Sequence, residues 1–245
     1  MPSHPHHAHA HHHAHHSEKH SGNTIALRDI VVGFSDGLTV PFALAAGLSG
    51  AVHSNAIIIT AGMAEIVAGT ISMGLGGFLA GQTEVEYYAG EKTREEKEVK
   101  EIPQEEEREV KEILAAYGIS PKLQDEVAGE LSKDHSKWVE FMMRFELGLE
   151  KPDPRQGFFS ALRIGFSYTA GGLVPLSAYF FCADPIQGLK ISAAMTITSL
   201  LLFGYWKARL SGQDRLKSTL TVAFTGIAAA GAAFWIARLI NGYAL

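Results

Sequence analysis

The chain has 245 residues, 47% of them hydrophobic, and a formal net charge of −5. Residues 84–150 hold 19 acidic and 10 basic side chains, a local balance of −9, while the remainder is largely apolar. The acidic balance argues against nucleic acid as a partner and favours cations, and the single cysteine, Cys182, excludes an internal disulfide and a thiolate metal cluster within one chain.

Residues 1–27 form a polar tail, with ten histidines among the first 20 residues. The tail lacks the apolar core and small-residue cleavage site of a signal peptide, so membrane insertion is expected to depend on later segments. We expect this tail to be disordered and, at most, to bind metal weakly.

Five apolar stretches are long enough to cross a bilayer, whose hydrocarbon core takes about 20 helical residues. They cover approximately residues 30–52, 54–79, 157–182, 186–206 and 216–240. The prediction is an all-α polytopic membrane protein, with transmembrane helices 1 and 2 within 28–83 and helices 3 to 5 within 151–245. A soluble helical domain is the alternative, but these apolar runs are too long for the buried helices of so small a domain.

The basic residues indicate an orientation. Lysines and arginines crowd residues 207–217, between the fourth and fifth stretches, whereas the first connection carries only His53. Connections rich in lysine and arginine are typically cytosolic. With five spans, the N-terminus and residues 84–150 share that cytosolic side, and the C-terminus lies on the opposite side.

Two acids, Asp36 and Glu65, lie inside the expected spans. Ionisable groups are costly within a bilayer, which makes both candidate functional residues. Pro41 cannot donate a hydrogen bond to the carbonyl of Gly37, so a free backbone oxygen is expected beside the Asp36 carboxylate. Glu65 shares its span with Met73, and a carboxylate with a thioether favours a first-row transition metal. The alternative is a protonated, hydrogen-bonded Glu65 with Met73 as packing filler.

Residues 84–150 are expected to form a cytosolic helical insert that binds metal. Pro103 and Gly118 would end two of its helices, and Pro121 would open another. Glutamates three residues apart share a helix face, and a pair of methionines near a glutamate follows on the last helix. The candidate ligands of the insert are Glu95, Glu98, Glu106, Glu109, Met142, Met143 and Glu146.

This set of carboxylates and thioethers suits iron(II), manganese, cobalt or zinc better than calcium. The alternative is a solvated, charged set of helices in which lysines and arginines pair with the acids. The residue pattern by itself leaves both interpretations open.

Three stretches carry a family resemblance: GFSDGLTVPFALAAGLSG at 33–50, AGMAEIVAGTISMGLGGFLAGQTEVEYY at 61–88 and FMMRFELGLEKPDP at 141–154. Together they resemble the vacuolar iron transporter family of plants and related organisms, over nearly the whole chain after about Arg28. The resemblance implies a dimeric five-span exchanger of the vacuolar membrane. Such a protein moves iron(II), and also manganese, from the cytosol into the vacuole against protons.

The resemblance also implies roles for the candidate residues. Asp36 and Met73 would line a pathway formed by the first spans of two protomers, and Glu65 would serve metal passage or proton coupling. The seven candidate ligands of the insert match the cytosolic metal-binding domain of the family. Independently, small residues recur every four positions at Ala68, Ser72, Gly76 and Ala80, which permits close helix contact within one chain or between two.

The predicted function is therefore a divalent metal/proton antiporter, not an enzyme, with no cofactor other than the metal that it binds or transports. A membrane-anchored cytosolic metal sensor or buffer is the alternative, but it would use the insert and need neither Asp36 nor Glu65. A membrane di-metal oxygenase would need histidines beside its carboxylates. Outside the tail, the chain has only His53 and His135.

Overall fold

The computed structural model describes residues 20–243, which form eight helices and no strand. The helices are α1 (His20–Ser49), α2 (Asn55–Glu101), α3 (Pro103–Ala116), α4 (Pro121–Leu131), α5 (His135–Phe145), α6 (Gln156–Phe181), α7 (Pro185–Leu210) and α8 (Arg215–Tyr243). The predicted all-α class is confirmed for this part of the chain. Most of the His-rich tail, residues 1–19, lies outside the described residues.

The first helix begins earlier than predicted. Residues 20–27, assigned to the disordered tail from composition, already belong to α1. No proline separates them from the apolar span, so the helix that starts in the span extends backwards through them, since adding a residue to an existing helix is easier than nucleating one. Pro41 lies inside α1, which continues past it to Ser49.

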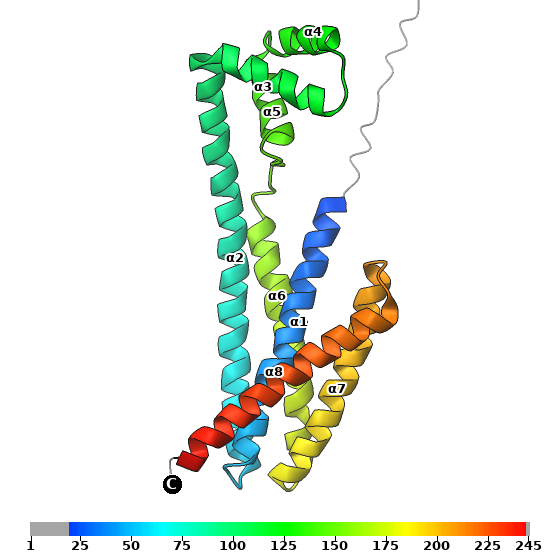
Figure 1. Cartoon of the computed structure of the whole chain (residues 1–245). Coiled ribbons are helices and arrows are strands. Elements are labelled where there is room, and N and C mark those ends of the chain that lie inside the picture. Colours follow the sequence, from blue (N-terminus) through cyan, green and yellow to red (C-terminus); the bar gives the residue numbers. More distant parts are fainter. Residues whose placement is uncertain (1–19, 244–245) are drawn as a thin grey trace, which may run out of the picture.

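Helix α2 is a single helix of 47 residues. At about 1.5 Å per residue it is about 70 Å long, roughly twice the ~30 Å of a hydrocarbon core. The boundary expected between residues 83 and 84 therefore falls within one continuous helix. Figure 1 shows α2 running the height of the molecule, with α3, α4 and α5 gathered around its far end.

Within the described residues, three helices are long and apolar enough to cross a membrane, namely α1 from Thr24 onwards, α2 and α7. These are three of the five predicted spans, and α6 and α8 stay predictions. Along α2, large apolar side chains one turn apart are exposed, including Val67, Ile71 and Leu75. Such a stripe on the outside of a helix is expected where a span faces lipid rather than water.

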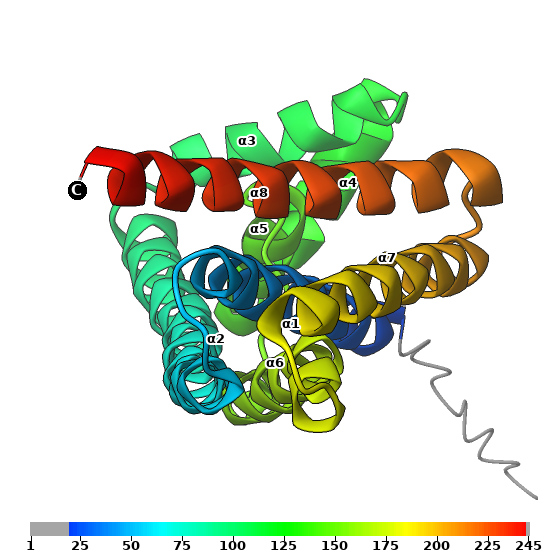
Figure 2. The ribbon, with the colours of Figure 1, turned by 90° about the horizontal axis from the view of Figure 1, so that it is seen from below.

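Helix α6 packs against both α1 and α2, while α7 and α8 contact each other and α1 (Figure 2). Gly33 and Gly37 let α1 approach α6 closely, because a Cβ atom on either would clash with the backbone oxygen of Ile164 or Tyr168. These two glycines therefore mark the closest approach of α1 to α6 that their missing side chains permit.

The insert has its own small core, separate from the bundle of long helices. Its buried side chains are Val99, Val110, Leu114, Ala128, Trp138, Val139, Met142 and Met143. Gly118 follows α3 with a φ of +77°, and Pro121 is the first residue of α4, as predicted. The last helix of the insert, α5, ends at Phe145, and Gly148 with a φ of +64° then turns the chain towards α6.

Candidate metal centre

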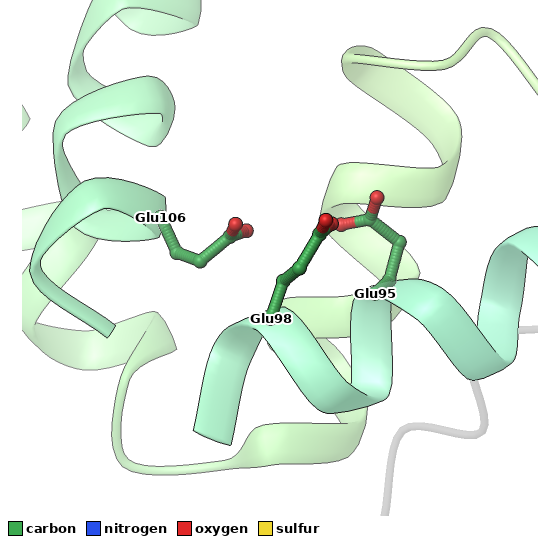
Figure 3. A group of neighbouring side chains, drawn as sticks. All are labelled: Glu95, Glu98 and Glu106. Atoms are coloured by element: carbon green, nitrogen blue, oxygen red, sulfur yellow. The ribbon is translucent and has the colours of Figure 1, made fainter. Parts of the chain in front are cut away.

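The end of α2 and the start of α3 bring three glutamates together. Oxygen atoms of Glu95, Glu98 and Glu106 all lie within 4.8 Å of one another. Glu95 and Glu98 share a face of α2 because they are three residues apart, and the corner at Ile102 turns α3 so that Glu106 points back towards them (Figure 3). We call these three residues the carboxylate cluster.

Two members of the carboxylate cluster are buried. Glu95 is 1% exposed and Glu106 is 3% exposed. In each, the Oε2 atom is buried and has no hydrogen-bond partner among the described residues. A buried charge is costly unless it is paired. Buried carboxylate oxygens without a hydrogen-bond partner, within a group of acids, therefore fit the coordination of a cation.

Two further glutamates act on the cluster. Loss of solvent, together with repulsion from Glu95 and Glu109, raises the pKa of Glu106 to about 7. Partial loss of solvent and the same two neighbours raise the pKa of Glu146 to about 7, although much of that residue stays exposed. Burial and repulsion from Glu98 also raise the pKa of Glu95. The structure thus places all five predicted glutamates in one electrostatic group.

Met142 and Met143 have a packing role in the insert. Both are at most 1% exposed, and they belong to the same buried cluster as Val99 and Val110. Methionine fills irregular gaps in such cores readily. Their additional role as thioether ligands stays a prediction.

Ion pairs account for many acids of the insert, as the alternative interpretation expected. Arg108 pairs with Glu105 and Glu112, which are exposed and outside the carboxylate cluster. Within the described residues, one basic side chain forms an ion pair with the cluster, and it is Arg94. Sequence reasoning missed Arg94, although its spacing from Glu98 by four residues is a pattern that indicates an ion pair on a helix.

In the spanning region, Glu65 of α2 accepts a hydrogen bond from the Tyr168 hydroxyl of α6. The second carboxylate oxygen of Glu65 is buried without a hydrogen-bond partner among the described residues. Asp36 is half-buried on α1, and the next residue, Gly37, packs directly against the backbone of Tyr168. Met73 is half-buried on α2. Coordination of one ion by Asp36, Glu65 and Met73 stays a prediction.

Two other partners were missed from the sequence. Tyr168 was not singled out, because a tyrosine in an apolar span gives no local sign of a distant acid. Asp29 was placed one residue outside the first span, yet it is 1% exposed and pairs with Arg163 of α6. The signal that would have found this pair is an arginine in the third apolar stretch, because a charge there needs a partner.

Known proteins are similar in sequence to nearly the whole chain. The sequence profile of the VIT family matches residues 27–238. The chain is 48% identical over 224 residues to vacuolar iron transporter 1 of Tulipa gesneriana, covering 91% of each protein. It is 48% identical over 225 residues to vacuolar iron transporter 1 of Arabidopsis thaliana, covering 92% of this chain and 90% of the relative. It is also 38% identical over 225 residues to protein CCC1 of Saccharomyces cerevisiae, covering 88% of this chain and 69% of the relative.

Proposed function

The chain belongs to the VIT family, and on that premise we propose that it is a transporter that moves iron(II) from the cytosol into the vacuole. The relatives that support this are named vacuolar iron transporters, and the similarity covers both the long helices and the insert. Manganese and similar divalent ions are further expected substrates, because oxygen and thioether ligands do not distinguish them sharply from iron(II).

The position of Glu65 is the observation that supports transport rather than metal binding alone. Its carboxylate lies on an apolar spanning helix, is held by Tyr168, and keeps one buried oxygen without a partner among the described residues. A charge in such a place is expected to mark an ion pathway. Together with Asp36 and Met73, it forms the proposed route through the membrane.

The carboxylate cluster is the proposed capture site on the cytosolic side, with Glu109 and Glu146 adding negative charge and Met142 and Met143 adding sulfur. Glu65 and Glu95 are separated by 30 residues of α2, which is about 45 Å along a helix. Capture and passage are therefore separate steps at separate sites, and an ion released from the insert must travel to the bundle before it meets Asp36.

Proton exchange follows from the chemistry of carboxylates, because the same oxygen holds either a metal ion or a proton. An acid that gives up its metal ion in the vacuole would return protonated to the cytosolic side. Asp36 and Glu65 are the proposed carriers of this exchange.

The proposed topology has five spans: α1, the apolar part of α2, α6, α7 and α8. The start of α1 and the turn between α7 and α8 lie on the side of the bundle that faces the insert, and the end of α8 lies at the opposite end (Figure 1). The basic residues at 207–217 support a cytosolic location for the side that faces the insert and a lumenal one for the C-terminus.

A homodimer is proposed because one face of α2 has no packing partner among the described residues. Ala68, Ser72, Gly76 and Ala80 are all exposed, and a Cβ atom added to Gly76 would meet no described atom of another helix within 4 Å. Small residues at this spacing support close contact between helices in a membrane. The second copy is the proposed partner of this face.

Uptake of iron(II) into liposomes under an imposed pH gradient tests the transport proposal. We expect uptake by the wild type and by Asp125→Ala, an acid exposed on the insert, and no uptake by Asp36→Ala. Equal uptake by Asp36→Ala would remove Asp36 from the mechanism. Metal binding without uptake by the wild type would favour the alternative function, a membrane-anchored metal sensor or buffer.

A further inference from the structure

Arg94 is half exposed, and its guanidinium group contacts several acids of the insert. Its guanidinium group approaches three glutamates: Nη1 lies 2.8 Å from Oε2 of Glu91, Nη2 lies 3.5 Å from Oε1 of Glu95, and Nε lies 3.5 Å from Oε2 of Glu98. Two of these belong to the carboxylate cluster. The Arg94 charge also acts on Glu146, where it opposes the repulsion from the neighbouring acids.

The carboxylate oxygens that Arg94 contacts are oxygens that a metal ion would need. Guanidinium binds carboxylates through a planar fork of N–H donors, and a divalent cation binds the same oxygens through their lone pairs. Two positive charges within a few ångströms of each other also repel. Arg94 and a metal ion are therefore competitors for Glu95 and Glu98.

We propose that Arg94 is an internal counter-ion of the metal-binding site that a divalent ion must displace, so that Arg94 lowers the affinity of the site. This inference rests on the proposed function, because it requires the carboxylate cluster to bind metal. The buried, unpartnered Oε2 atoms of Glu95 and Glu106 are the independent sign that this group of acids takes a ligand.

Lower affinity serves a capture site that must also release its ion. Without a counter-ion, five carboxylates in one group would hold a divalent cation tightly and give it up slowly. Arg94 is half exposed, so it can swing into solvent while keeping its close contact with Glu91. The return of its charge to Glu95 and Glu98 would then favour departure of the ion.

Arg108 is the matched control. It lies on the next helix, is 53% exposed against 49% for Arg94, and likewise pairs with glutamates of its own helix. Its partners, Glu105 and Glu112, lie outside the carboxylate cluster. Removing the Arg108 charge therefore changes the net charge of the insert by the same amount without freeing a proposed ligand.

The test is calorimetric titration of the full-length protein in detergent with manganese(II) and, separately, cobalt(II). We expect Arg94→Gln to bind each ion about fivefold more tightly, as for loss of one half-exposed ion-pair partner. Arg94→Lys, which keeps the charge, should stay near the wild type, and Arg108→Gln should be unchanged. Glu106→Gln should bind more weakly.

The outcomes separate the two proposals. Unchanged or weaker binding by Arg94→Gln, with weaker binding by Glu106→Gln, would overturn the role of Arg94 and leave the metal site standing. Unchanged binding by Glu106→Gln would overturn the metal site itself. A mere structural defect cannot produce tighter binding, and Arg94→Ala provides a second measurement should the glutamine variant fail to fold.

Discussion

Asp29 of α1 and Arg163 of α6 form an ion pair between two packed helices, with Nη2 of Arg163 2.9 Å and Nε 3.0 Å from the same Oδ2 atom of Asp29. Asp29 is almost completely buried, and Arg163 is 29% exposed. Two donors from one guanidinium group fix the position of the carboxylate. The pair therefore holds α1, which carries Asp36, in a set register against α6.

Replacing Asp29 with asparagine should destabilise the protein. The substitution leaves the Arg163 charge largely buried without its partner, and breaking such a pair costs roughly 3 kcal/mol. Thermal unfolding of the purified protein in detergent is the measurement, with Asp125→Asn on the surface of the insert as the control. Equal melting temperatures for the two variants would show that the pair does not stabilise the bundle.

Replacing Tyr168 with phenylalanine should impair iron uptake. The change removes the hydrogen bond that the hydroxyl donates to Glu65, and a hydrogen bond to a charged group contributes about 1.5–3 kcal/mol. We expect uptake at low iron(II) concentration to fall at least tenfold, a factor that corresponds to about 1.4 kcal/mol. Liposome uptake over a range of iron concentrations measures KM and the maximal rate separately.

Tyr179→Phe is the control for this change, because Tyr179 is also buried on α6 and its hydroxyl lies 2.9 Å from Oγ of Ser49, a partner that is not an acid. The Tyr179→Phe variant loses one buried hydrogen bond but keeps the hydrogen bond between Tyr168 and Glu65. Similar losses of uptake in both variants would mean that Tyr168 only supports the fold.

Helix ends marked by a proline or a glycine were predictable from the sequence, whereas the start of α1 and the partners of charged residues were not. Pro103, Gly118 and Pro121 act locally, through a missing N–H group or a positive φ, so their effects can be read directly. The continuity of α2 was missed because hydropathy falls at the membrane surface while the helix meets no breaker before Pro103. Hydropathy reports the solvent around a segment and not its backbone conformation.

The carboxylate cluster was predictable in part. Residues three apart, such as Glu95 and Glu98, share a face of any helix, so this pair follows from spacing alone. The approach of Glu106 depends on the angle between α2 and α3, which no local pattern encodes. Tyr168 and Glu65 are 103 residues apart in the chain, and only the packing of α6 on α2 brings them together.

Metal binding to the insert should weaken as the pH falls from 7.5 to 6. The pKa values of Glu106 and Glu146 are both raised to about 7, by loss of solvent and by neighbouring carboxylates. Below pH 7 these groups are mainly protonated, and a metal ion must displace the proton. We expect the affinity for manganese(II) to fall by about tenfold per pH unit for each proton displaced.

Calorimetric titration of the full-length protein at pH 6 and pH 7.5 is the measurement. Glu105→Gln, an exposed acid paired with Arg108 outside the cluster, is the control and should show the wild-type dependence. In the metal-free protein, the contribution of Glu106 to the free energy of unfolding has the opposite pH dependence: it falls as the pH rises, whereas the metal affinity increases. The pKa of Glu106 is higher in the folded state than its ordinary value of 4.5, so its contribution to stability is greatest below pH 4.5 and is lost as the pH rises through 7. An affinity that does not change with pH would mean that neither glutamate binds the ion.

Replacing Glu91 with glutamine should weaken metal binding through Arg94. Glu91 is outside the carboxylate cluster, yet it makes the closest contact of the Arg94 guanidinium group, at 2.8 Å. Without Glu91, Arg94 would interact with Glu95 and Glu98 alone and compete more strongly with the metal ion. We expect manganese(II) affinity to fall about twofold to fivefold, the range of one exposed ion pair.

Loss of a negative charge near the site would also weaken cation binding, so the decisive measurement is a double-mutant cycle. In the Arg94→Gln background, Glu91→Gln should change the affinity much less than it does in the wild type, because the competitor that Glu91 holds away is gone. An equal decrease in both backgrounds would show that Glu91 acts only through its charge, and that Arg94 does not move between Glu91 and the carboxylate cluster.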